Sequence, residues 1–137
     1  MKKTSKPIYV ETFSTERAGI KVSFSVQDIV TNLQNELKKR LQKEGFQLSE
    51  SENESMVISG EFVMINEGNQ FLRWFIGPFG VGATKLEIEG TIKEDGKEIK
   101  KFNFSRKGRG GIFGGSSKNL LISNISGISK DIIRLLI

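Results

Sequence analysis

The sequence predicts an α+β fold, a two-layer sandwich in which two amphipathic helices cover a mainly antiparallel sheet of four or five strands. Three observations carry this prediction. Apolar residues recur at helical spacing in two stretches, one before residue 45 and one after residue 116. Residues 84–92 alternate between apolar and polar side chains, which is typical of a strand with one buried face. Asp95-Gly96 then favours a tight hairpin into another strand. The predicted order is β-α-β-β-β-β-α.

The first third of the chain contains a short strand and the clearest helix. Residues 8–13 are β-branched and aromatic, and they predict a strand. Residues 20–26 alternate, which fits either a second short strand or an extended lead into the helix. Ser25 with Asp28 three positions later resembles a capping box, and the helix after it should end before Gly45. Its apolar stripe comprises Val26, Ile29, Val30, Leu33, Leu37 and Leu41.

Four strands should follow this helix. In the first, residues 56–65, the alternation places Ile58, Phe62 and Met64 on one face and Ile65 on the other. Residues 71–76, 84–92 and 97–105 supply the others. In the last strand Ile99 is out of phase with the phenylalanines, which predicts a β-bulge near Lys100 or Lys101.

The final helix should begin at Ser116 or Ser117, either of which can cap it. Its apolar residues are Leu121, Ile125, Ile128, Ile132 and Leu136. Gly127 inside this helix costs about 1 kcal/mol relative to alanine, so we expect it to mark a close contact with the sheet.

Composition narrows the possible functions. The 137 residues fit a single domain, with residues 1–6 as a flexible tail. The chain contains no histidine and no cysteine, which excludes thiolate nucleophiles, histidine-based triads and nearly all zinc sites. No run reaches the roughly 18 apolar residues of a membrane-spanning helix. We therefore expect a non-enzymatic protein without metal or cofactor.

Two glycine-rich segments are the candidate binding elements. Residues 77–82 have the glycine spacing of a phosphate-binding loop, but the lysine arrives only at Lys85 and a strand follows instead of a helix, so a turn is the better interpretation. The second segment, residues 106–115, does precede a helix. It fits a connector, an anion-binding site or a partner surface.

The positive charge is concentrated in one stretch. Residues 97–118 contain seven basic residues against one acidic residue, whereas residues 1–96 carry a net charge of −2. Phe102, Phe104 and Phe113 are interleaved with these basic residues, so the stretch has the composition of a binder of single-stranded nucleic acid or anionic lipid. Phenylalanines at alternating strand positions are more often core residues, which makes this the second-ranked function.

The middle of the chain resembles a known protein family. Gly60 in a strand, Gly68-Asn69, Arg73, the glycines at 77, 80 and 82, and the Asp95-Gly96 hairpin before a phenylalanine-containing strand are similar to the domain-of-unknown-function 4410 (DUF4410) family. These are small bacterial envelope proteins, many of them regarded as lipoproteins. The resemblance implies a periplasmic or outer-membrane-associated domain held by a lipid anchor that this chain does not contain. Without a removed signal and anchor cysteine, a cytoplasmic location would follow.

Together these observations predict a binding or assembly module of the cell envelope. Its partner would be another protein or a second copy, and nucleic acid is the less favoured partner. Glycine-rich loops with arginine and exposed aromatic residues are common contact elements. The candidate contact residues are Arg73, Trp74, Phe79, Arg106, Lys107, Arg109 and Phe113. Trp74 and Phe79 fit the end of the core equally well.

Overall fold

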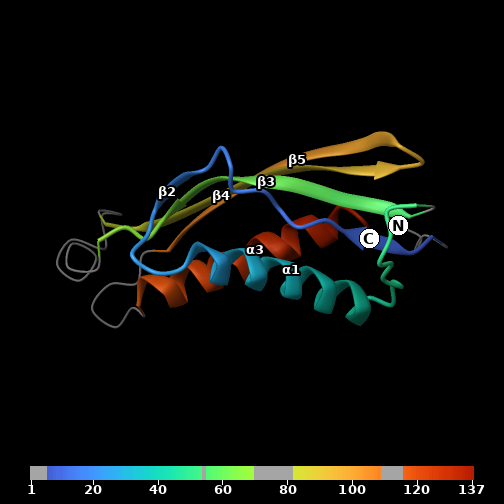
Figure 1. Cartoon of the computed structure of the whole chain (residues 1–137). Helices are drawn as coiled ribbons and strands as arrows, with labels where there is room; N and C mark the ends of the chain where they lie inside the picture. The colour runs from blue at the N-terminus through green and yellow to red at the C-terminus, as the bar shows by residue number, and fades with distance from the viewer. Residues whose placement is uncertain (1–5, 54, 70–81, 109–115) are drawn as a thin grey trace.

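A computed structural model describes residues 6–53, 55–69, 82–108 and 116–137, and within them it contains two helices and a five-stranded sheet (Figure 1). The elements are β1 (Ile8–Val10), β2 (Gly19–Lys21), α1 (Val26–Lys43), β3 (Met56–Asn66), β4 (Thr84–Glu94), β5 (Lys97–Gly108) and α3 (Ser117–Arg134). The predicted α+β class is confirmed. The strand expected at residues 71–76 lies outside the described residues, as does the predicted tail up to residue 5.

The sheet is mixed, and most of its pairing is antiparallel. The strand order is β1-β3-β4-β5, and β2 pairs with the far end of the same edge of β3 as β1. β1 and β2 run parallel to β3, because the helix α1 carries the chain back to the start of the sheet. Between β1 and β2 the chain stays close to β3, since Glu11 N donates to Ile58 O at 2.9 Å and Ser14 N to Gly60 O at 3.1 Å. Of the alternating residues 20–26, only Ile20 and Lys21 belong to a strand, β2.

Both helices cover one face of the sheet and lie side by side in the same direction (Figure 1). α1 packs near β1, whereas α3 packs against β4 and β5. Arg40 of α1 donates to Ser126 Oγ of α3 at 2.8 Å, and Lys118 pairs with Asp28 at 2.8 Å. No described helix is long and apolar enough to cross a membrane.

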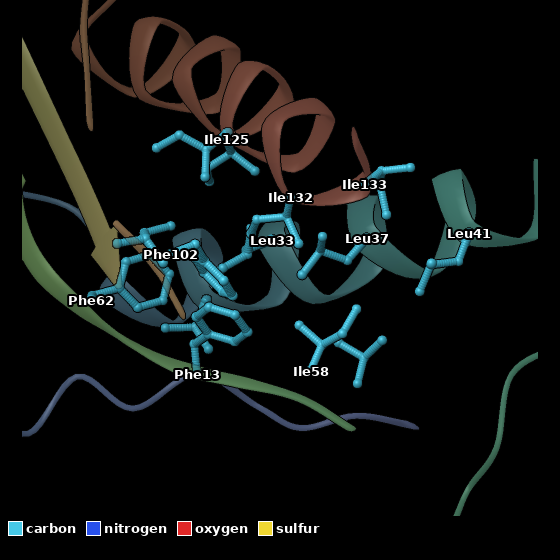
Figure 2. Packing of buried hydrophobic residues seen from close by; sticks show 14 of the residues in the cluster. Phe13, Leu33, Leu37, Leu41, Ile58, Phe62, Phe102, Ile125, Ile132 and Ile133 are labelled. Atoms are coloured by element: carbon cyan, nitrogen blue, oxygen red, sulfur yellow. The ribbon is translucent and has the colours of Figure 1, made fainter. Parts of the chain in front are cut away.

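The core between the two layers contains the predicted helix stripes (Figure 2). Of the apolar positions predicted in the two helices, only Val26 is partly exposed. Gly60 of β3 and Gly90 of β4 pair with one another, and two phenylalanine rings pack against them. A Cβ at Gly60 would lie 2.8 Å from the Phe13 ring, and one at Gly90 would meet Phe102. The two rings, with centroids 6.4 Å apart, occupy the space that side chains at these glycines would take.

The turns and caps agree with the sequence in most places. Asp95 and Gly96 both have positive φ, 54° and 76°, as a type I′ hairpin requires. Gly45 ends α1 with a φ of 88°. Ser116 caps α3 by accepting a hydrogen bond from Asn119 N. The prediction of a capping box at Ser25 is wrong, because the Ser25 side chain makes no capping hydrogen bond.

Two bulges shift the predicted side-chain phase. In β3 the register shifts between Phe62 and Met64, so Ile65 is fully buried and Met64 only partly. The predicted faces of these two residues are therefore wrong, because an extra residue reverses the alternation. The bulge predicted in β5 is present, but it lies at Ile99, which has no partner between Glu98 and Lys100.

Candidate functional site

The two glycine-rich segments begin and end at the same end of the sheet. The first segment, residues 77–82, lies in the connection from β3 to Thr84 of β4, and the second, residues 106–115, begins in the last residues of β5 and continues from Gly108 towards Ser117 of α3. Thr84 and Gly108 are paired neighbours in the sheet. The described ends of both segments therefore lie next to one another, and we call this region the loop end.

A buried polar cluster fixes the loop end. Thr84 is fully buried, and its Oγ1 accepts hydrogen bonds from Gly108 N at 3.0 Å and from Asn124 Nδ2 at 3.1 Å. Its own hydroxyl lies 3.4 Å from Gly108 O, to which it donates. A Cβ on Gly108 would lie 2.6 Å from Thr84 Oγ1 and 3.0 Å from Leu120 Cβ, so glycine is required here for close packing. One threonine thus joins β4, β5 and α3 where both segments start.

The described ends of the connection between β3 and β4 are also held together. Asn69 N donates to Gly82 O at 2.9 Å, and Gly68 N donates to Asn66 Oδ1 at 2.7 Å. Gly68 and Gly82 have positive φ, 67° and 78°. A Cβ at Gly68 would collide with Gly82 O, so both the backbone angle and the available space require glycine.

Five of the seven candidate contact residues lie outside the described residues: Arg73, Trp74, Phe79, Arg109 and Phe113. The other two are adjacent in β5 and lie on opposite faces of the sheet. Both are exposed, and Arg106 lies on the helix side, where its side chain crosses α3. Arg106 Nη2 lies 2.9 and 3.0 Å from the two carboxylate oxygens of Asp131.

The Arg106 contact explains Gly127. A Cβ on this glycine would lie 3.0 Å from the Arg106 guanidinium carbon, so the glycine leaves room for the arginine to cross the helix. The predicted close contact between α3 and the sheet is confirmed. Sequence reasoning missed Asp131 as the partner, although its position four residues after Gly127 places both on one helix face.

The basic stretch does not present its strand phenylalanines to solvent. Phe102 is buried, and Phe104 is half-buried and stacked on it at a centroid distance of 5.7 Å, on the helix side of the sheet. The buried ring of Phe102 is unavailable for the base stacking that nucleic-acid binding would need, and one face of Phe104 is already covered by Phe102. Lys100, Arg106 and Lys118 also have partners within the chain.

The opposite face of the sheet carries a shallow groove of about 770 Å³ that the sequence did not predict. Glu61 and Glu89 are directly paired across β3 and β4 within it. Like charges in such a pair repel, and Arg17 offsets the repulsion because it donates two hydrogen bonds to Glu61. These hydrogen bonds lower the pKa of Glu61. Only alternation along β3 and β4 could have indicated this pair.

Comparison with known proteins gives a family and a fold. The sequence model of the family "Domain of unknown function (DUF4410)" matches residues 8–111. A comparison with curated protein sequences finds no match.

Several solved structures share the fold at low identity. PelC from Paraburkholderia phytofirmans, crystallised as a dodecamer, has a TM-score of 0.56 and 12% identity over 93% of this chain and 92% of that chain. A Xanthomonas campestris protein of the DUF330 family has a TM-score of 0.62 and 8% identity, over 96% and 83% of the two chains. A minor lipoprotein from Acinetobacter baumannii has a TM-score of 0.53 and 16% identity, over 98% and 92%. These likenesses establish the fold alone.

Proposed function

Because this chain belongs to the DUF4410 family, we propose that it is a non-enzymatic binding and assembly domain of the bacterial cell envelope that contacts its partners at the loop end. This chain shares its fold with a lipoprotein, which supports the envelope location. A dodecameric fold neighbour supports self-association as one form of assembly. The lack of histidine and cysteine leaves few groups for acid-base or nucleophilic catalysis.

The observation that carries the proposal is the Thr84 cluster. It fixes the start of β4 and the end of β5 on a buried threonine, so both glycine-rich segments leave one rigid base. Contact residues on loops act together when a rigid scaffold fixes the loop ends. A partner that binds at the loop end would then meet both segments together.

Site-specific photo-crosslinking in intact cells tests this proposal. A photoreactive phenylalanine analogue replaces Phe79 in the full natural protein, and a second variant carries it at Lys38, an exposed position on α1. We expect a larger covalent adduct with the Phe79 variant only, containing either another protein or a second copy. Equal adducts at both positions, or no adduct at Phe79, would overturn the loop end as the contact surface.

Cell fractionation tests the location separately. We expect the natural protein to be recovered with the envelope, and the gene to encode a signal and a lipidation-site cysteine upstream of Met1. Recovery with the cytosol from a gene lacking both would refute the envelope assignment.

A further inference from the structure

The C-terminal ends of the two helices enclose a cleft at the end of the molecule away from the loop end. α1 and α3 run in the same direction, so both of them end here (Figure 1). The cleft has a volume of about 170 Å³. Its charged lining consists of four basic side chains and one acidic side chain: Arg40, Lys43, Lys130 and Arg134, with Glu44. We call it the basic cleft.

Three of the four basic groups are free or only weakly paired. Lys43 and Lys130 are exposed, and neither forms an ion pair or a side-chain hydrogen bond with another described residue. Arg134 lies 3.6 Å from Asp131 in an exposed ion pair, which contributes little. Asp131 already has two shorter contacts with Arg106. These three cations are therefore available to an anion.

The fourth basic group, Arg40, is held at the wall of the cleft with donors left over. Its Nη2 donates to Glu36 Oε1 and to Ser126 Oγ, each at 2.8 Å. Its Nε is buried and has no hydrogen-bond partner in the described part of the chain. A guanidinium has five N–H donors, so these contacts orient the group without exhausting it.

The acidic groups at the cleft do not cancel this charge. Glu36 balances Arg40, which leaves three basic side chains beside Glu44 and the terminal carboxylate of Ile137. Neither of these two acids forms an ion pair within the described ranges. The balance of charge at the cleft is therefore positive, and Glu44 opposes the binding of an anion.

Basic residues near helix C-termini also complement the helix dipole, but here the terminal carbonyl groups have other donors. In α1, Arg40 O and Gln42 O accept from the N–H groups of the two residues that follow the helix, each at 3.0 Å. Beyond α3, Leu135 O accepts from Lys100 Nζ of β5 at 2.7 Å. The side chains that line the cleft are not needed as donors at these helix ends.

We propose that the basic cleft binds an anionic phosphate group, carried by a lipid headgroup or free in solution. Arginine offers a planar pair of donors that matches phosphate oxygens, and lysine adds a point charge. A cleft of this volume holds several water molecules, which a phosphate group would replace. Ile133 and Ile137 also line the cleft, so the apolar part of a lipid would find a contact beside the charges. This site goes beyond the proposed function, because it lies away from the loop end.

Two titrations of the full chain test the proposal and separate the two sources of phosphate. Amide chemical shifts are followed in inorganic phosphate and in sodium chloride at the same ionic strength. Sedimentation measures binding to vesicles of phosphatidylglycerol, which is anionic, and of phosphatidylcholine, which has no net charge. The cleft variant carries Lys43→Gln and Lys130→Gln, and circular dichroism checks that each variant is folded. The control carries Lys21→Gln and Lys38→Gln, which remove the same charge at exposed positions that do not line the cleft.

We expect saturable binding of at least one phosphate source. Inorganic phosphate that shifts the amides of residues 40–45 and 130–137 would identify a site for the free anion. Binding to phosphatidylglycerol vesicles alone would identify a lipid headgroup. The cleft variant should bind that source on the order of tenfold more weakly, whereas the control should bind it as the natural chain does. Glu44→Gln should bind more tightly, because it removes the negative charge at the cleft.

Four results would overturn the proposal. They are binding of neither source, equal binding to the two kinds of vesicle, a control that loses as much affinity as the cleft variant, and a Glu44→Gln variant that binds no more tightly than the natural chain. None of these results affects the Phe79 crosslink, so failure here is distinguishable from failure of the proposed function.

Discussion

Replacing Thr84 by valine should destabilise the fold more than its small change in volume suggests. The hydroxyl accepts two hydrogen bonds, from Gly108 N at 3.0 Å and Asn124 Nδ2 at 3.1 Å, in a site without solvent access. Valine keeps the shape but leaves both donors buried and unpaired, and each costs about 1–3 kcal/mol. The added methyl group returns about 0.8 kcal/mol, so the free energy of unfolding should fall by about 1–5 kcal/mol.

Thr84→Ser is the matched control, because it keeps the hydroxyl and loses one methyl group, at a cost of about 1 kcal/mol. Denaturant unfolding followed by circular dichroism gives both values. In Thr84→Val the amide of Gly108 should also exchange its hydrogen faster. Adding Asn124→Ala to this variant removes one orphaned donor, so the two changes should cost less together than their sum. A valine variant as stable as the serine variant would refute the assignment of this cluster as the clamp of the loop end.

Three further predictions concern separate parts of the fold. Gly60→Ala should lower the free energy of unfolding by about 2 kcal/mol or more, because its Cβ overlaps the Phe13 ring and a strand carbonyl, whereas Gly19→Ala, with its nearest neighbour at 3.9 Å, should change the melting temperature little. Ser116→Ala should cost about 1 kcal/mol in denaturant unfolding through loss of its cap, while Ser25→Ala should cost only a few tenths. The folded-state pKa of Glu61 is lowered, so its stabilising effect is present above the unfolded value near 4.5 and is lost as pH falls through the folded value. Glu61→Gln should therefore flatten the acid side of the stability-pH curve, and an unchanged curve would contradict this assignment.

Much of the fold follows from periodicity. The helix stripes, the hairpin at Asp95 and the buried face of β4 are local patterns, in which each residue's position depends on near neighbours. β-Bulges escape this reasoning, because one extra residue reverses every later side chain while the composition stays the same. Ile65 shows the consequence, since strict alternation assigns it to the solvent face and the bulge buries it.

The parallel pairing of β1 with β3 and of β2 with β3 could not be predicted from the sequence either. Each strand has three residues, and its partner β3 lies more than thirty residues further along the chain. The Thr84 cluster was missed for a similar reason, because its three members come from three elements and none belongs to a recognisable motif. Gly127 was the exception, because a glycine inside a regular element indicated a close contact before its partner was known.

The basic stretch shows how the fold changes the meaning of a charge run. Along the chain, residues 97–118 combine positive charge with phenylalanine, which favours nucleic acid. In the fold, Phe102 and Phe104 turn toward the helices, and the lysines of β5 lie along an edge of the sheet. Salt alone cannot distinguish the two kinds of partner, because phosphate contacts and protein ion pairs both weaken as ionic strength rises. Addition of single-stranded nucleic acid does, since only a nucleic acid binder would shift its mobility.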